Sequence, residues 1–385
     1  MLYNYSFANR KRDLSDVMAT VIKDEPRFIS NFRMAPDAAS AKHEYLEDQL
    51  TGRSVAVTAI AGDTATLADG DAAKLKPGTL IALKDNPALF RVTGINGNTA
   101  GLEIAAVNGS EYDSVTALPD TGGRFIIVST PMNEGTSNGD GEENYHLSNV
   151  QWNATQIFRK EIVLSGTALA VNLYGTADSQ LNRQTAFALS DLARDLNRVA
   201  LFGRRVEASG NVRGEAGGLY FFGTDSAVPC IDAGKTTLDS FLINDAAQQI
   251  LGEGGDPMQI LCSPGQARVI SNEYRDRIQI LRSDDRRGAY VAVIVNEING
   301  RGMTIMADPD MPDGDAWVVD PNCFALANLA GRAITDMDAT PNGFDGIRRV
   351  AIGELTFEFK NVKQRCCRIK NLLASSEAIA ALRTA

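Results

Sequence analysis

The stretch from Asp178 to Arg205 constrains the fold more than any other part of this 385-residue chain. Its apolar residues recur at helical period and fall on one stripe: Leu181, Ala188, Leu189, Leu192, Leu196, Val199 and Ala200. Asp178 is a suitable N-cap and Gly203 a suitable stop, so the pattern predicts one helix about 35–40 Å long, at ~1.5 Å per residue. A helix of this length needs another element lying along its apolar stripe.

Strand patterns occur before and after this helix. The segment from Trp152 to Val171 reads as strand. Near the C-terminus, Leu355, Phe357 and Phe359 alternate with polar residues, which is typical of a sheet with one face buried. The sequence therefore predicts an α+β fold in which the long helix, residues 178–205, lies on a long antiparallel sheet.

Composition argues against several classes of protein. The net charge is −10 and the pI about 4.9, whereas a protein that grips nucleic acid needs a basic face. No apolar run approaches the ~20 residues that cross a bilayer, and no apolar segment follows the basic cluster at 10–12 as in a secretory signal. The five scattered cysteines favour a reducing compartment.

Residues 1–43 have the character of an arm. Apolar residues between Leu14 and Ile22 keep helical spacing, and Pro26 ends the pattern, so one short helix is expected. Five aromatic side chains are too many for a disordered tail: Tyr3, Tyr5, Phe7, Phe28 and Phe32. We expect them to pack on a neighbour, either within the chain or between chains.

Residues 51–128 have a different residue pattern from the segments on either side. Short strand-like runs alternate with turn signals such as Asn96-Gly97, Asn108-Gly109 and Lys76-Pro77-Gly78. This spacing predicts a small all-β module, a barrel or a sandwich. Strand-like sequence resumes on both sides, so the module is inserted rather than appended. It is followed by a polar, acidic loop at 129–145.

Residues 236–332 predict an α/β unit. Thr236 and Asp239 form a capping-box-like start for a helix whose apolar side is Leu238, Phe241, Leu242, Ala246 and Ile250. Ser263 is placed to cap a second helix that begins at Pro264. Four short apolar runs, at 258–262, 290–295, 302–306 and 316–319, are expected to be strands.

Metal-binding patterns are weak. His43 and His146 flank the β module without a set of further ligands at diagnostic spacing, which favours structural roles. The aspartates of 308–314 resemble a calcium loop, but Pro312 occupies a ligand position. A strand pattern turns Cys366 and Cys367 to opposite faces, which favours packing over a disulfide or zinc.

Catalytic patterns are equally weak. Gly234-Lys235-Thr236 ends like a phosphate loop, but Pro229 stands where that motif needs glycine. No nucleophile elbow and no paired-carboxylate pattern is evident. We therefore expect neither an enzyme nor a bound cofactor or metal.

The extended segments indicate an assembly subunit. An arm, a long two-stranded excursion and a lone long helix leave apolar surface that the chain by itself does not cover. We expect inter-subunit contacts at the five arm aromatics and, further along, at Trp152, Phe158, Arg194 and Arg198.

The strand Gln156-Ile157-Phe158, the Ser165-Gly166-Thr167 turn, the helix–strand–helix run at 237–274 and the final strand at 353–372 carry a resemblance. On these motifs the chain resembles major capsid proteins of tailed bacteriophages, specifically the SU-ten-like major head protein family with the Hong Kong 97-type fold. The resemblance covers nearly the whole chain in order.

The resemblance implies a domain order. It is an N-terminal arm at 1–43, an extended loop at 44–160 that contains the β module at 51–128, a peripheral domain at 161–235 and 333–385, and an axial domain at 236–332. It also implies self-assembly as hexamers and pentamers into a virion head inside the host bacterium. Portal and scaffolding or decoration proteins are the implied partners.

Two other functions remain open from the residues. An encapsulin shares this fold but encloses cellular cargo; its chains are usually shorter and lack a β insert of this size, so residues 51–128 favour the phage. An enzyme with an undetected site is the third alternative. For the β module, either tighter contacts between neighbours or an exposed surface for host or decoration proteins fits the sequence.

The acidic balance generates the first prediction. The isolated subunit is expected to show no strong binding to duplex DNA at ~0.15 M salt, because it lacks the positive charge that releases counterions from DNA. Fluorescence anisotropy with labelled DNA measures this. Tight binding that disappears as salt is raised would contradict the expectation that packaged DNA meets this chain only through weak contacts.

Overall fold

The chain divides into two compact units, Met1–Tyr45 with Val150–Ala385 and Leu46–Asn149. The computed structural model describes residues 26–47, 54–61, 64–68, 71–83, 89–104, 106–107, 110–111, 124–131, 134, 149–171, 180–225, 228–273 and 292–384. The predicted helix at 14–22, its aromatic neighbours Tyr3, Tyr5 and Phe7, and the predicted cap Asp178 lie outside these residues.

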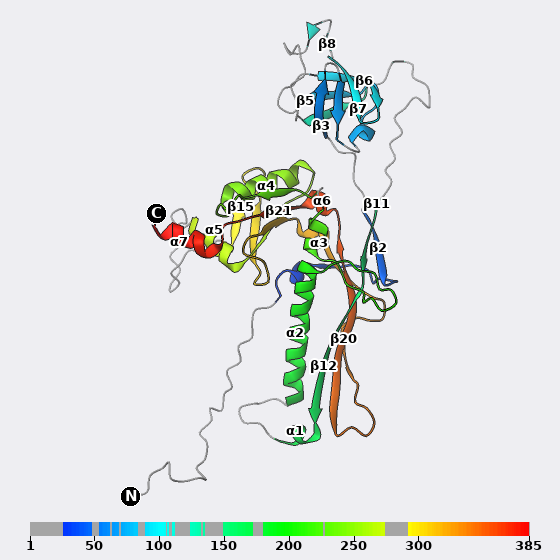
Figure 1. Ribbon diagram of the computed structural model, residues 1–385, viewed down its shortest axis with the longest axis vertical. Coiled ribbons are helices and arrows are strands. Elements are labelled where there is room, and N and C mark those ends of the chain that lie inside the picture. Colours follow the sequence, from blue (N-terminus) through cyan, green and yellow to red (C-terminus); the bar gives the residue numbers. More distant parts are fainter. Residues whose placement is uncertain are drawn as a thin grey trace. The chain divides into compact units, whose positions relative to one another are not determined.

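The predicted long helix is α2, Gln180–Phe202, and it contacts two long strands, β12 and β20 (Figure 1). The strands are β12, Gln156–Ser165, and β20, Gly346–Phe359, paired antiparallel over their whole common length from Gln156↔Leu355 to Ser165↔Gly346. The prediction of an α+β fold with a long helix on a long antiparallel sheet is confirmed.

The long sheet continues on the other edge of β20. Its order is β1-β18-β20-β12, and β19 also pairs with β20. The added strands are β1, Arg33–Met34, β18, Phe324–Asn328, and β19, Thr335–Asp338. Because β18 pairs with the C-terminal half of β20 and β19 with its N-terminal half, β20 is the central strand throughout its length.

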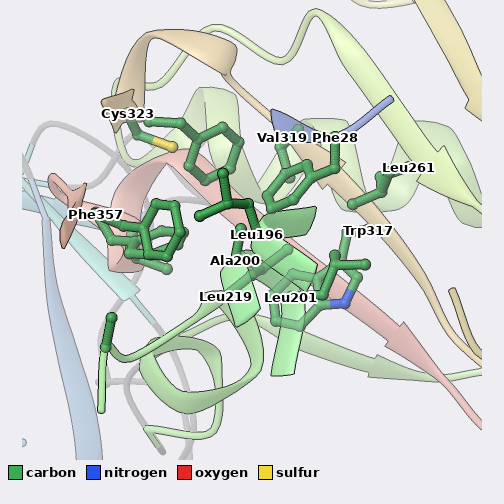
Figure 2. Close-up of a cluster of buried hydrophobic side chains, with 14 of the residues drawn as sticks. Phe28, Leu196, Ala200, Leu201, Leu219, Leu261, Trp317, Val319, Cys323 and Phe357 are labelled. Atoms are coloured by element: carbon green, nitrogen blue, oxygen red, sulfur yellow. The ribbon is translucent and has the colours of Figure 1, made fainter. Parts of the chain in front are cut away.

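A hydrophobic core fills the space between α2 and this sheet (Figure 2). Leu196, Ala200 and Leu201 of α2 are buried together with Phe357 of β20. The buried apolar residues of α2 all lie at Leu192 or later, so burial is confined to its C-terminal half. Gly203 follows α2 where a Cβ would lie 2.2 Å from the carbonyl oxygen of Ala216, so this close packing permits only glycine.

The strand predicted from Trp152 to Val171 is in fact three elements. β11, Asn149–Ala154, precedes β12, and α1, Gly166–Ala170, follows it. The strand prediction was wrong beyond Ser165, because the hydroxyl of Ser165 accepts a hydrogen bond from the backbone N–H of Ala168 at 3.3 Å and begins a helical turn.

A second sheet, of six strands in the order β13-β21-β17-β14-β16-β15, has its own core. The strands are β13, Cys230–Asp232, β14, Gln259–Cys262, β15, Val293–Val295, β16, Gly302–Ala307, β17, Ala316–Val319, and β21, Cys366–Lys370. Other elements of this unit are η2, Ile29–Asn31, α3, Leu219–Gly223, α4, Ser240–Gly252, α5, Pro264–Glu273, η4, Pro321–Cys323, α6, Val362–Arg365, and α7, Ser375–Thr384.

The start of α4 corrects two predictions. Asp239, and not Thr236, caps the helix by accepting a hydrogen bond from the N–H of Leu242 at 2.9 Å. Phe241 was placed on the apolar side but is 73% exposed. The helix starts three residues later than expected, and its buried side also carries Ile243 and Ala247.

The second unit contains a closed barrel of six strands in the order β10-β3-β4-β7-β6-β5. These are β3, Ser54–Ala61, β4, Thr64–Leu67, β5, Leu80–Leu83, β6, Leu89–Asn96, β7, Thr99–Ile104, and β10, Arg124–Ser129, with η3, Asp71–Lys74, and the short pair β8, Ala106–Val107, and β9, Ser110–Glu111. Phe90 and Phe125 meet edge to face in its core. Closure leaves the barrel strands without a free edge.

The packing of α2 generates a stability prediction. Leu196→Ala is expected to lower the free energy of unfolding by about 2–5 kcal/mol, because it leaves a cavity beside Phe357 in a filled core. Leu189→Ala, on the same helix but 39% exposed, is the matched control and should cost under about 1 kcal/mol. Urea unfolding of both variants followed by circular dichroism measures the difference. Equal losses would show that α2 is not held by this core.

Candidate functional site

The outer sheet face is the face of β12, β19 and β20 that is turned away from α2. Phe158 packs into the α2 core, and Lys160 forms an ion pair with Asp195 of α2 at 2.5 Å. Residues alternate along a strand, so Ile157 and Val163 point the opposite way. They are 54% and 47% exposed, so β12 presents branched apolar side chains to solvent on this face.

A hollow of about 420 Å³ lies in the outer sheet face. Its lining is apolar with two arginines, and includes Arg159, Arg332, Thr335, Met337, Val350 and Ile352. Met337 is itself 46% exposed. The hollow has no paired acid and base, so its chemistry suits apolar side chains of another molecule rather than a reaction.

The same face of β20 is covered further along the strand. The covering element is the entry ribbon, a two-stranded sheet formed by β2, Lys42–Glu47, and β11. Glu354 is 7% exposed, and its carboxylate accepts a hydrogen bond from the Thr155 hydroxyl at 2.6 Å and pairs with Arg332 at 3.2 Å. A buried carboxylate therefore has both a hydrogen-bond donor and a cation.

A second buried carboxylate, Glu358, holds the first strand of the entry ribbon. Its Oε1 lies 2.7 Å from Nε2 of His43, and its Oε2 lies 2.7 Å from Nζ of Lys360. Burial acts to raise the pKa of Glu358, but the hydrogen bonds from His43 and Lys360 and their charges outweigh it and leave the pKa below its ordinary value. Glu358 is therefore a carboxylate that stays ionised in the interior.

Two side chains of the entry ribbon form hydrogen bonds to the edge of β20 beyond Leu355, where the pairing of β20 with β12 stops. The amide of Asn153 donates to the carbonyl of Phe357 at 2.8 Å and to that of Gly217 at 3.0 Å. The Tyr45 hydroxyl donates to the carbonyl of Phe359 at 3.2 Å and accepts from its N–H at 3.3 Å. These side chains satisfy backbone groups that a neighbouring strand would otherwise pair with.

The described N-terminal segment is fixed by a polar junction on α2. Asn197, 0% exposed, accepts a hydrogen bond from the N–H of Ile29 at 3.2 Å and donates to Asp308 at 3.0 Å and to Asp310 at 3.1 Å. Asp308 also accepts from the N–H of Phe28 at 3.1 Å. These hydrogen bonds fix the backbone at Phe28 and Ile29 against α2 and the loop that carries Asp308.

The family model of the SU10 major capsid protein matches residues 2–373. The chain belongs to the SU10 major capsid protein family. It is therefore a structural protein of the virion head of a tailed phage and not an enzyme. The capsid is assembled from repeated copies of such a subunit.

Solved capsids share the fold of this capsid protein at low sequence identity. The Cyanophage A-1(L) capsid is 9% identical, with a TM-score of 0.57 over 97% of this chain and 100% of that chain. The capsid of a native GTA particle is 9% identical, with a TM-score of 0.52 over 96% and 97%. The holo-SrpI encapsulin of Synechococcus elongatus PCC 7942 is 9% identical and covers 60% of this chain and 79% of that chain, with a TM-score of 0.44.

The comparison with curated proteins gives no match. The family match, which spans nearly the whole chain, decides for the phage capsid over the encapsulin alternative.

The aromatic residues expected at subunit contacts lie in varied places. Phe28, 2% exposed, and Phe158, 6% exposed, are buried in the capsid protein's own core, so little of either ring is left for a neighbouring copy. Phe32 stacks on Phe324 at 5.4 Å between ring centroids. Trp152 lies between two cations, with Arg205 4.2 Å and Lys42 5.1 Å from its ring centroid.

The two arginines of α2 that were expected at subunit contacts pair within the chain. Arg194 forms an ion pair with Asp191 at 3.2 Å, one helical turn away. Arg198 pairs with Asp310 at 3.1 Å, and the hydrogen bond and charge of Asp310 raise the pKa of Arg198. Both arginines keep exposed surface, so contact with another copy stays a prediction for them.

Sequence reasoning missed the residues that fix the entry ribbon and the N-terminal segment. Asn153, Asn197 and Asp308 are each 0% exposed, yet asparagine and aspartate are common surface residues. One signal was present: Asn197 stands beside Leu196 on the buried side of the helix, where a polar residue needs a partner.

The structure adds two observations on metals and membranes. Within the described residues, no group of three or more histidine, cysteine or carboxylate side chains is arranged to hold a metal ion, and His146 lies outside those residues. Among the described helices, none combines the length and the apolar character needed to span a membrane.

The Glu358 pair generates a pH prediction. Because the pKa of Glu358 is lowered on folding, its contribution to stability is full above its unfolded pKa and is lost as the pH falls through its folded pKa. Glu358→Gln should therefore lower stability at pH 7 and make the loss of stability below about pH 4.5 less steep.

Urea unfolding at a series of pH values from 7 to about 3.5 tests this. The control is Glu161→Gln, which removes an exposed carboxylate of β12 that pairs with Arg159 at the surface, where ion pairs contribute little. A wild-type acid slope in Glu358→Gln would contradict the role of this carboxylate.

Proposed function

We propose that copies of this chain join as hexamers and pentamers and close an icosahedral head around the double-stranded DNA of a tailed phage, assembling in the host bacterial cytoplasm. The observation that carries the proposal is the outer sheet face. Its apolar side chains and its hollow are open to solvent in the single chain, and a neighbouring copy would remove them from water.

The domain order of the resemblance fits the two sheets when two strands, β18 and β21, are reassigned. The long sheet with α2 would be the peripheral domain, and the six-stranded sheet with α4 and α5 the axial domain. β18 belongs to the long sheet although it precedes residue 333, and β21 belongs to the six-stranded sheet although it follows it. We propose these sheet memberships as the boundary between the peripheral and axial domains. The arm at 1–43 and the extended loop at 44–160 contribute β1 and the first part of β12 to the long sheet.

The charge distribution supports an outward position for the unit at 46–149. Eight of the ten net negative charges of the chain fall between residues 46 and 149. Packaged DNA would repel a unit of this charge, and the side of the shell away from the DNA removes that repulsion. The module at 51–128 would then be available for contact with neighbours or with decoration proteins.

The remaining partners of the proposal follow from the family resemblance. A portal protein and a scaffolding protein would contact the shell during assembly. The packaged DNA would meet the inner wall only through weak contacts, since the chain as a whole is acidic.

Assembly itself tests the proposal through the outer sheet face. Ile157→Ser with Met337→Ser should leave the subunit folded but lower the yield of closed shells about tenfold or more, because ~1.4 kcal/mol lost per contact is tenfold in an equilibrium constant. Shells are counted by electron microscopy and sedimentation after expression. Circular dichroism and thermal unfolding show whether the variant is folded.

The matched control is Val212→Ser. Val212 is 54% exposed, the same as Ile157, but lies in the loop after α2. It should leave the shell yield unchanged. A wild-type yield from the double variant would remove the outer sheet face from the proposed contacts, and a subunit that never forms shells would remove the proposal itself.

A further inference from the structure

Two buried thiols meet where the two sheets of the first unit join. The sulfur of Cys323 lies 3.6 Å from the sulfur of Cys366, and the two residues are 1% and 0% exposed. Cys323 ends η4 and leads into β18 of the long sheet, while Cys366 begins β21 of the six-stranded sheet. Figure 2 shows the sulfur of Cys323 among the core side chains.

Backbone hydrogen bonds hold both cysteines in place. The carbonyl of Cys323 accepts from the N–H of Lys360 at 2.9 Å, and its N–H donates to Asp320 at 3.1 Å. On the other side, the backbone N–H of Asp320 donates to the carbonyl of Arg365 at 2.9 Å, and Cys366 is paired with Val319 across the sheet. The sulfurs need to approach by only about 1.5 Å to reach the ~2.05 Å of a disulfide bond.

The other cysteines have different surroundings. Cys367 belongs to the core of the six-stranded sheet, with its sulfur 3.6 Å from the amide oxygen of Gln249. Cys262 is buried in the same core, and Cys230 is exposed. Cys230 lies near enough to Cys367 for its charge to act on the Cys367 thiol, but within the described residues the recorded sulfur–sulfur contact is the one between Cys323 and Cys366.

We propose that Cys323 and Cys366 are a latent disulfide site, closed by a low-molecular-weight disulfide such as oxidised glutathione when the head leaves the reducing cytoplasm. One thiolate attacks the small disulfide, forms a mixed disulfide and releases one small thiol. The second thiolate attacks the protein sulfur of the mixed disulfide, closes the bond and releases a second small thiol. The two cysteine protons end on the two small thiols, so the exchange balances.

Burial of the two thiols slows this reaction. The thiolate is the reactive form, and burial and the neighbouring Cys366 raise the pKa of Cys323 well above its ordinary value, so exchange waits for a local opening of the core. The closed bond would join the long sheet to the six-stranded sheet across 43 residues of chain. The claim that the bond closes in released heads rests on the proposed function, whereas the distance between the two sulfurs does not.

Peptide mapping of the full chain tests the proposal without requiring shells. The protein is incubated with oxidised glutathione at about pH 8, where the thiolate fraction rises. Free thiols are then alkylated, and unreduced tryptic peptides are identified by mass spectrometry. Cys366 and Cys367 share one tryptic peptide, so the mapping uses Cys367→Ser as its background. The expected product is a linked Cys323–Cys366 peptide that forms more slowly than the mixed disulfide at exposed Cys230 and faster in mild urea.

Thermal unfolding gives the second readout. Oxidation should raise the Tm by about 5–10 °C, and the rise should vanish in Cys366→Ser but persist in Cys230→Ser. If Cys323 and Cys366 are still alkylated singly after Cys230 has reacted completely, even in mild urea, the proposal is overturned. It is equally overturned if Cys323 links to Cys367 in Cys366→Ser at least as fast as it links to Cys366 in Cys367→Ser. Either result leaves the capsid function untouched, because that is judged by shells.

Discussion

Burial of the C-terminal half of α2 against the long sheet is the contact on which the rest of the first unit depends. Leu192, Leu196, Ala200 and Leu201 meet the inward side chains of β20, and Trp317 of the second sheet joins the same core. One helix thereby holds the two sheets together, because the core it fills is shared by both. The N-terminal half of α2 has no buried apolar residue, so the helix extends beyond the core that stabilises it.

The central strand β20 shows how one strand serves two surfaces. Its inward side chains are aromatic and aliphatic and stabilise the core, while its outward side chains near the C-terminus are Glu354, Thr356 and Glu358. These polar groups are buried because the entry ribbon covers them, and the two carboxylates are paired with cations and hydrogen-bond donors. Toward the other end of β20 the same face forms part of the hollow that is lined by apolar side chains and two arginines.

Membership in a capsid family places the function of this chain in its surfaces rather than in a catalytic group. A shell subunit works through the shape and polarity of its surfaces, so selection acts on packing and on pairing of buried charges rather than on a few catalytic groups. Solved capsids at about 9% identity keep the fold because many different apolar sequences with the same periodicity fill the same core.

The sequence by itself determined the elements whose signal is local. The period of α2 and the alternation of β20 lie within single segments, so the long helix, the long sheet and the α+β class could be predicted from them. It did not determine which face of α4 is buried or the buried roles of Asn153, Asn197 and Asp308. Those were decided by tertiary structure, because the partners of these groups stand up to 280 residues away in the chain, and no pattern within one segment records a hydrogen bond to another.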